Sequence, residues 1–405
     1  ITMMAYTSPL FRFLSLLLSL IITPISAGRD VVALTQWAKD HGVQMHENLQ
    51  WKDYGHQDWG LILTKPVEQG TVLLKVPREL ILDSTVLKKK YTETECTQVI
   101  EALGDFAIHE ENFWIVLELY KLKCQPQSRM SPWLAAMPES FPQFTREEIE
   151  CLPFYAKYAA EYQEKKFATF CHALEALKDT IEFGNKDIPT LKWAFQAVNS
   201  RFWKLSLRPT SELVPLADMM NHRDPPNMQM VPEDLDHVTF GYLGDEADKE
   251  STDKYERDIF ISYGQPGNPH RFLVIFGFVP GVESMPNVWS HADYGESNPY
   301  SKEFNKMVVD AQDGTISQQV WDAVLWELML PASQEEFEQG KEAKHAQFKH
   351  ITTNVLKTHV TQQLDELNSL RLKLETTEGP NMALIRQHND FLTSVFSKVL
   401  DNLNA

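Results

Sequence analysis

The sequence predicts an α+β fold: a β-rich domain that carries a helical insertion, followed by an all-α C-terminal domain. Helical spacing, with apolar residues every three or four positions, fills 84–205 and returns after 285. Short apolar runs rich in β-branched residues lie on both sides of the first helical stretch and predict strands. These runs are found at 59–64, 71–76, 237–243 and 258–263.

The chain has 405 residues, of which 43% are hydrophobic and 11% aromatic, and these can fill the cores of two domains. We expect residues 1–27 to be a signal or targeting segment that takes no part in the fold. The β-rich domain is expected at 28–280, with its mainly helical insertion at about 84–205, and the helical domain at 285–405.

The N-terminus has the pattern of a secretory signal. Arg12 precedes the apolar stretch 13–22, and Pro24 and the small residues at 26–27 follow it. Because this stretch is short for a membrane span, a cleaved signal for the secretory pathway is the first expectation. A retained anchor and, in an alga, the first part of a plastid address are the alternatives. No stable membrane span is expected after cleavage.

The first elements after this segment are a helix and two strands. Apolar positions at 31–41 share one helical face. The runs 59–64 and 71–76 follow, with Pro66 and Gly70 as turn residues between them. We therefore expect these two runs to form a β-hairpin-like unit.

The insertion and the chain after it contain a few clear boundaries. A connection broken by prolines is expected at 131–143, and the last helix of the insertion at 190–203. The next apolar run leads into a turn at Asn221-His222. Between the two later strands, the acidic segment 244–257 predicts a solvated loop.

The C-terminal region is expected to contain long helices. Apolar residues recur at helical spacing in 321–328 and 351–374, Gly379-Pro380 then breaks the pattern, and 382–403 resumes it. Packing of these helices on one another within the chain is the first expectation, and a coiled coil is the alternative. We expect a monomer.

The net charge of −18 argues against a broad nucleic-acid surface. Acidity is compatible with a basic protein partner, although acidic residues also serve solubility alone. No two of the four cysteines form a CxxC pair, so we expect free thiols and no zinc cluster. The motifs of dinucleotide-binding proteins, P-loop proteins, zinc proteases and esterases are absent.

Several short pieces remain, and each alone has a purely structural explanation. An Asn after an apolar run caps a turn, an Arg at a helix end is a surface charge, and a Tyr at a strand end packs on the sheet. Their order along the chain is the informative feature. The pieces are Trp59-Gly60-Leu61, Asn199–Phe202, Leu213–His222, Ile259–Gly264 and Gly277-Phe278.

Together these pieces resemble the SET domain, specifically the branch of the Rubisco large-subunit lysine methyltransferases and the actin-histidine methyltransferases. The resemblance covers about 45–280, where 84–205 is similar to that branch's insertion, and 285–405 is similar in character to its substrate-binding domain. It implies methyl transfer from S-adenosyl-L-methionine to a lysine of a protein substrate, with histidine as the second candidate. No metal is required for this reaction.

The resemblance also implies roles for single residues. Tyr263 occupies the position of the catalytic tyrosine, and Phe276 borders the substrate channel. The backbone around Gly60 would approach the cofactor closely, and a guanidinium suits its carboxylate. The residues expected to bind the cofactor are Trp59, Gly60, Leu61, Ser200, Arg201, Asp218, Asn221, His222 and Phe278.

Two departures from the family pattern leave the acceptor open. Phe276 stands where lysine-methylating members commonly have a tyrosine, so a second hydroxyl near the acceptor is missing. The segment before Asn268 also differs, and Pro269 would either displace the next helix or begin it. A catalytically weak or inactive SET-fold module that binds proteins is therefore the alternative function.

Overall fold

The structure is a computed structural model. The expected targeting segment 1–27 and much of the acidic segment 244–257 lie outside the residues it describes, so both expectations stay predictions. No helix within the described ranges is long and apolar enough to cross a membrane. The described residues are 30–55, 58–125, 127–178, 187–204, 210–231, 236–245, 255–264, 268–279, 281, 287–289, 298–300, 306–331 and 333–405.

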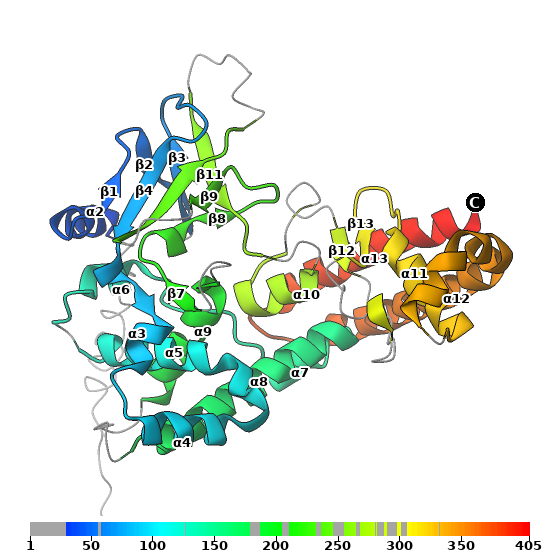
Figure 1. Cartoon of the computed structure of the whole chain (residues 1–405), viewed down its shortest axis with the longest axis horizontal. Coiled ribbons are helices and arrows are strands. Elements are labelled where there is room, and N and C mark those ends of the chain that lie inside the picture. The colour runs from blue at the N-terminus through cyan, green and yellow to red at the C-terminus, as the bar shows by residue number, and fades with distance from the viewer. Residues whose placement is uncertain are drawn as a thin grey trace, which may run out of the picture.

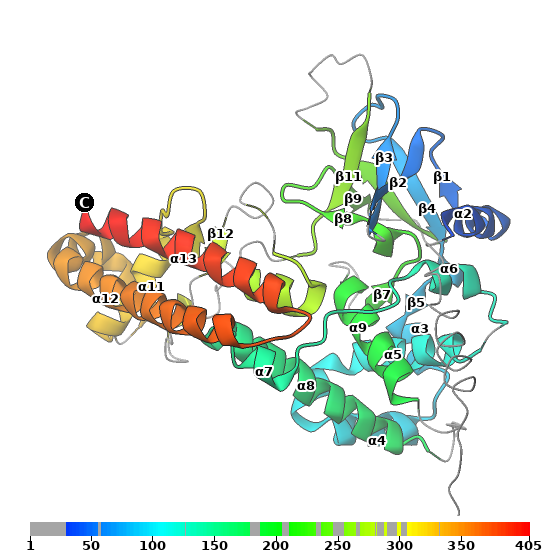
Figure 2. The same ribbon diagram turned by 180° about the vertical axis from the view of Figure 1, so that it is seen from behind.

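The strands and helices separate in space as they do along the sequence. Most strands gather at one end beside a group of helices, and the C-terminal helices extend from that group as an elongated arm (Figure 1). The view from behind shows the same arrangement (Figure 2). The α+β class with a helical C-terminal region is therefore confirmed.

Two four-stranded sheets form the β-rich part. The first expected helix is present as α2 (Val31–Asp40) beside them. One sheet has the order β1 (Gln44–Met45), β4 (Val72–Pro77), β10 (His237–Tyr242), β9 (Met228–Val231). The other has the order β2 (Leu49–Gly55), β3 (Asp58–Leu63), β11 (Arg257–Ile261), β8 (Asn221–His222).

The expected hairpin between β3 and β4 is wrong, because these strands lie in different sheets. β3 instead pairs with β2 in antiparallel register, Trp51 opposite Leu61. β2 carries few apolar residues, so its sequence does not stand out as a strand. It ends only three positions before β3 begins, and so short a connection favours pairing of these two strands.

The Asn221-His222 turn is also wrong in detail. These residues form β8, which pairs in parallel with β11: Asn221 lies opposite Phe260 and His222 opposite Ile261. Asn227 holds this region from within, since its buried side chain accepts a hydrogen bond from the Phe260 amide (2.8 Å) and donates one to the Asp258 carbonyl (2.8 Å). Parallel pairing brings distant parts of the chain together.

A small sheet has the order β5 (Leu82–Asp83), β7 (Ser211–Leu213), β6 (Trp203–Lys204). The helices of the insertion lie in the sequence between β5 and β6. This confirms the helical character of 84–205, although α6 lies inside the stretch expected to be a broken connection. The helices are α3 (Ser84–Lys88), α4 (Glu93–Leu103), α5 (Glu110–Lys123), α6 (Ser131–Ala136), α7 (Arg146–Ile149), α8 (Phe154–Glu175) and α9 (Ile188–Arg201).

The C-terminal region consists of α11 (Gln318–Met329), α12 (Gln334–Thr376) and α13 (Met382–Asn404), as expected. α12 and α13 pack on one another through buried apolar residues on both helices, which supports packing within the chain. A two-stranded sheet of β12 (Asn287–Trp289) and β13 (Val308–Asp310) adds to this region, and no sequence pattern indicated it.

An apolar cluster joins the C-terminal region to the rest of the chain. Its members come from α7, α8, the segment after Asn268, α12 and α13. A pair of buried histidines lies beside it, with His270 Nδ1 at 3.1 Å from His388 Nε2. Burial lowers the pKa of His388 to about 4, so the pair is neutral at neutral pH. The C-terminal helices therefore support the segment 268–278.

A buried carboxylate completes this junction. Glu148 is fully buried and accepts hydrogen bonds from the backbone amide (2.6 Å) and the side-chain amide (3.0 Å) of Asn381, at the start of α13. It also accepts one from the Thr145 amide (2.8 Å) and so caps α7. A Cβ at Gly379 would collide with this carboxylate, which explains a glycine at the break between α12 and α13.

Glu148→Ala should lower the free energy of unfolding by about 3 kcal/mol, because buried amide groups lose a charged acceptor. Urea denaturation of the full chain measures this change. Glu147→Ala is the matched control: its side chain is exposed, and we expect a change below about 0.5 kcal/mol. Equal effects of the two substitutions would contradict the role of Glu148.

Candidate functional site

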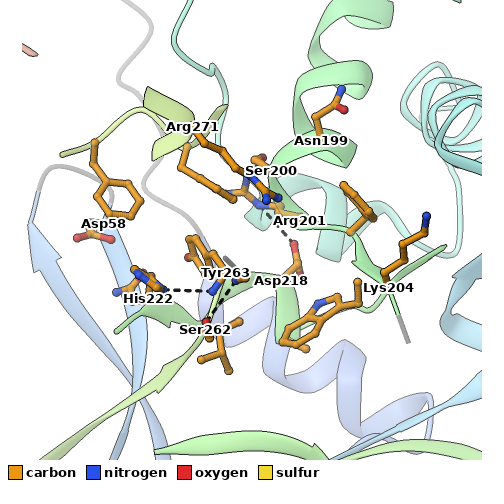
Figure 3. Close-up of a pocket in the computed structure, with 18 residues that line it drawn as sticks. Asp58, Asn199, Ser200, Arg201, Lys204, Asp218, His222, Ser262, Tyr263 and Arg271 are labelled. Atoms are coloured by element: carbon orange, nitrogen blue, oxygen red, sulfur yellow. Dashed lines mark hydrogen bonds and ion pairs between the residues drawn. The ribbon is translucent and has the colours of Figure 1, made fainter. Parts of the chain in front are cut away.

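A pocket of about 910 Å³ lies where β8, the end of β11, the end of α9 and the segment 268–278 meet. Figure 3 shows its side chains converging from these elements. Eight of the residues expected from the sequence line it, so the tertiary structure brings together positions from 200 to 278. They are Ser200, Arg201, Asp218, Asn221, His222, Tyr263, Phe276 and Phe278.

The expected residues of β3 lie outside this lining. Leu61 is a core residue, and Trp59 packs against the same core, whereas their neighbour Asp58 lines the pocket. Gly60 acts on the site indirectly, since a Cβ there would lie 2.8 Å from Nδ2 of Asn221. A glycine therefore lets β3 approach Asn221 closely.

Arg201 ends α9 and is held in the pocket by its neighbours. One terminal nitrogen donates a hydrogen bond to Ser200 Oγ (2.7 Å), and Nε lies 3.8 Å from Oδ2 of Asp218. Asp218 is itself positioned by the indole N–H of Trp133, which donates to Oδ1 (3.1 Å). The guanidinium packs over the ring of Phe141, 4.9 Å from its centroid. The pocket thus holds an oriented cation.

Tyr263 lies two residues after the end of β11, and its hydroxyl is held by a hydrogen bond. Its O–H donates to the carbonyl of Met220 (2.7 Å), and its backbone N–H donates to Nδ1 of His222 (3.2 Å). Burial raises the pKa of Tyr263 to about 12, against the opposing influence of the Arg201 charge. The phenol is therefore protonated at neutral pH, and its oxygen can still accept a hydrogen bond from a ligand.

His222 is a neutral group in this pocket. Burial lowers its pKa, and the Asp224 carboxylate, 3.6 Å from Nε2, opposes that shift only in part. Because Nδ1 accepts the Tyr263 amide, the ring proton is placed on Nε2. His222 therefore acts as an oriented N–H donor and an aromatic surface.

Five rings form an aromatic cluster at the pocket, and four of them line it: His222, Tyr263, Phe276 and Phe278. Short centroid distances join His222 to Phe272 (4.7 Å), Tyr263 to Phe276 (4.8 Å) and Phe272 to Phe278 (5.2 Å). A π-helix begins at Phe272 and ends at Phe276, and Gly277, with a φ of 78°, leads to Phe278. Such π-turns are frequent at functional sites, and aromatic faces attract cations.

The contacts of Asn268 show that Pro269 begins the next helix and does not displace it. The Asn268 side chain caps α10 (Pro269–Arg271) by accepting the Arg271 amide (2.9 Å), and Pro269 sits in the first turn, so this proline begins the helix.

Sequence reasoning missed several residues of the site. Arg271 lines the pocket, yet in the sequence it precedes an apolar run as a surface charge would. Phe272 packs behind the lining against His222, and it lies in an apolar run typical of any buried helix. The unexpected lining residues are Asp58, Asn199, Phe202, Trp203, Lys204, Ala217, Ile261, Ser262, Gly264 and Arg271.

The pocket is suited to a ligand that carries both positive and negative charge. Its lining offers the oriented guanidinium of Arg201, several aromatic faces and the hydroxyl of Tyr263. Among the described residues, no group of three or more His, Cys, Asp or Glu side chains could hold a metal ion.

The sequence matches no protein-family model, and a search of curated proteins finds no relative. Solved structures do match. The structure of Rubisco LSMT bound to sinefungin and monomethyllysine has a TM-score of 0.55 at 14% identity, covering 92% of this chain and 91% of that chain. The SET domain of LSMT bound to lysine and AdoHcy has a TM-score of 0.57 at 14% identity, covering 94% and 92%.

These similarities establish the fold of the chain as that of the LSMT SET domain structures, and they extend over its helical C-terminal region. A further match is the structure of Rubisco LSMT bound to AdoMet, with a TM-score of 0.55. The resemblance to actin-histidine methyltransferases and the roles of the single residues stay predictions.

Asp218→Ala should lower the free energy of unfolding by about 3 kcal/mol, because it leaves the buried Arg201 without a counter-charge and the Trp133 indole without an acceptor. Asp218→Asn keeps the indole acceptor and should cost clearly less. Urea denaturation of both variants tests this order. An alanine variant as stable as the wild type would show that Asp218 does not hold Arg201.

Proposed function

We propose that this protein is an S-adenosyl-L-methionine-dependent methyltransferase that modifies a lysine side chain of a protein substrate, with histidine as the second candidate acceptor. The observation that carries the proposal is the position of the Tyr263 hydroxyl, which shares one pocket with Arg201 and Asn221-His222 in a SET fold. The LSMT structures of this fold contain sinefungin with monomethyllysine in one case, AdoHcy with lysine in a second and AdoMet in a third.

The residues of the pocket fit this cofactor. Arg201 Nε and His222 Nε2 are buried donors without a hydrogen-bond partner in the described part of the chain. A guanidinium suits the carboxylate of the cofactor, and Asn221 can bind its amino group. Phe278 offers a face for the adenine, and the aromatic cluster suits a sulfonium cation. Gly60 lies outside the pocket lining, and its part in cofactor binding is indirect: the absence of a side chain lets the backbone of β3 lie against Asn221.

The reaction requires alignment more than acid–base chemistry. The bound cofactor supplies an electrophilic methyl group. Tyr263 orients the acceptor amine through its hydroxyl oxygen, and the Met220 carbonyl, which accepts a hydrogen bond from this hydroxyl, fixes the direction of the oxygen. The apolar wall formed by Phe276 and its neighbours excludes water and lowers the pKa of an incoming lysine, so that its nitrogen enters neutral. No side chain here has to act as a metal ligand.

The alternative is a SET-fold module that binds proteins without catalysis. The observation that favours it is the contact of Phe276 with Tyr263, whose ring centroids lie 4.8 Å apart, because a phenylalanine beside this hydroxyl supplies no second hydroxyl to position an acceptor. The same contact bears on the choice of acceptor nitrogen and on the number of methyl groups added. Binding of S-adenosyl-L-methionine and transfer of its methyl group to a protein together distinguish an enzyme from a binding module.

The full chain should bind S-adenosyl-L-methionine in isothermal titration calorimetry, and Arg201→Gln should weaken binding by at least about tenfold, since a charged hydrogen bond is lost. Arg386→Gln, on the exposed face of α13, is the matched control and should bind as the wild type does. A folded wild-type sample that gives no heat of binding would rule out the proposal.

Tyr263→Phe should reduce methyl transfer by about 100-fold, because the oriented hydroxyl is lost from the reacting geometry. Its affinity for S-adenosyl-L-methionine should stay within about threefold of the wild type. Transfer of a radiolabelled methyl group to a protein extract measures the first quantity, and calorimetry the second. Mass spectrometry of the labelled proteins identifies lysine or histidine as the acceptor. Full methyl transfer by Tyr263→Phe would contradict the catalytic role assigned to Tyr263. Cofactor binding by the wild type without any methyl transfer would favour the non-catalytic binding module.

A further inference from the structure

Arg271 presents a cation to the pocket without an anion to balance it. Within the described residues, its guanidinium forms no ion pair and donates no hydrogen bond, and Nε is fully enclosed. It packs against the ring of Phe276, 5.7 Å from the centroid. Burial lowers its pKa, and no carboxylate of the described residues opposes that shift. A partly buried charge of this kind is costly unless something pairs with it.

A second basic side chain lies close to Arg271. Lys166 is almost completely buried, donates a hydrogen bond to Oδ1 of Asn199 (2.6 Å) and packs against two phenylalanine rings. Burial, and then the charge of Arg271, lower its pKa to about 7, so Lys166 is only partly protonated at neutral pH. Asn199, which lines the pocket, separates this amine from the cavity, and Arg271 is the permanent cation here. Arg201, by contrast, faces Asp218.

The position of Arg271 places it on the acceptor side of the proposed site. Asn268 fixes its backbone at the end of α10, directly before the π-helix. Phe276, which Arg271 contacts, packs on Tyr263. Figure 3 shows Arg271 among the side chains that converge on the pocket. A group bound by Arg271 would therefore lie close to the residue that Tyr263 orients.

We propose that Arg271 binds a carboxylate of the acceptor substrate, and that this protein selects segments in which an Asp or Glu lies beside the methylated residue. This inference rests on the function proposed above. The cofactor carries a single carboxylate, and Arg201 is placed to bind it, so a second carboxylate has to come from the acceptor. A guanidinium fork binds a carboxylate through two parallel hydrogen bonds, which makes the choice specific.

Peptides in matched pairs test this selection. Blocked heptapeptides with a central lysine, identical except for Asp or Asn at one flanking position, are incubated with the full chain and radiolabelled S-adenosyl-L-methionine. For at least one position, kcat/KM should be about tenfold higher with Asp. Arg271→Gln should remove this preference and leave the affinity for S-adenosylhomocysteine within about threefold. Arg271→Lys, which keeps the charge, should retain part of the preference.

Lys204→Gln is the control, because Lys204 lines the same pocket but is largely exposed, so its loss removes the same charge from the rim. The preference for Asp should persist in that variant. Transfer without any preference for Asp in the wild type overturns this inference and leaves the proposed function intact. Lost affinity for S-adenosylhomocysteine in Arg271→Gln, with an unchanged preference for Asp, assigns the carboxylate to the cofactor and also overturns it. Absence of both cofactor binding and transfer overturns the inference and the function together.

Discussion

The parallel pairing of β8 with β11 is the contact on which the site depends. It places His222 opposite Ile261, the last residue of β11. Tyr263, two residues further on, therefore lies beside the histidine ring. The Tyr263 hydroxyl can then donate to Met220, one residue before β8. Asn227 supports the pairing from inside the fold. A single strand contact therefore sets the tyrosine, the neutral histidine and the Asn221 amide in one fixed arrangement.

The C-terminal region contributes to the same site at a distance. Its helices α12 and α13 cover the segment that contains the π-helix, through a shared apolar cluster and the histidine pair. Glu148 of α7 accepts hydrogen bonds from Asn381 and so connects the start of α13 to α7. These contacts hold Arg271 and Phe276 against the pocket, so loosening the C-terminal helices should disturb the acceptor side first.

The charges of the pocket are distributed unevenly. Arg201 is balanced in part by Asp218, whereas Arg271 forms no ion pair with any residue that the structure describes. Tyr263 and His222 are neutral at neutral pH because burial disfavours their charged forms. A ligand that enters this pocket therefore meets the charges of Arg201 and Arg271 and neutral hydrogen-bonding groups, and its own carboxylates decide where it is held.

The sequence by itself determined the long helices, several of the strands and a large part of the candidate site. Periodicity located α9, the strands β10 and β11 and the long C-terminal helices, because burial of one face repeats along each element. The resemblance in motif order named eight residues that meet in one pocket. Only the tertiary structure decided that β3 pairs with β2, that Asn221-His222 is a strand, and that Arg271 lines the pocket. These features depend on contacts between distant residues, which local periodicity does not record.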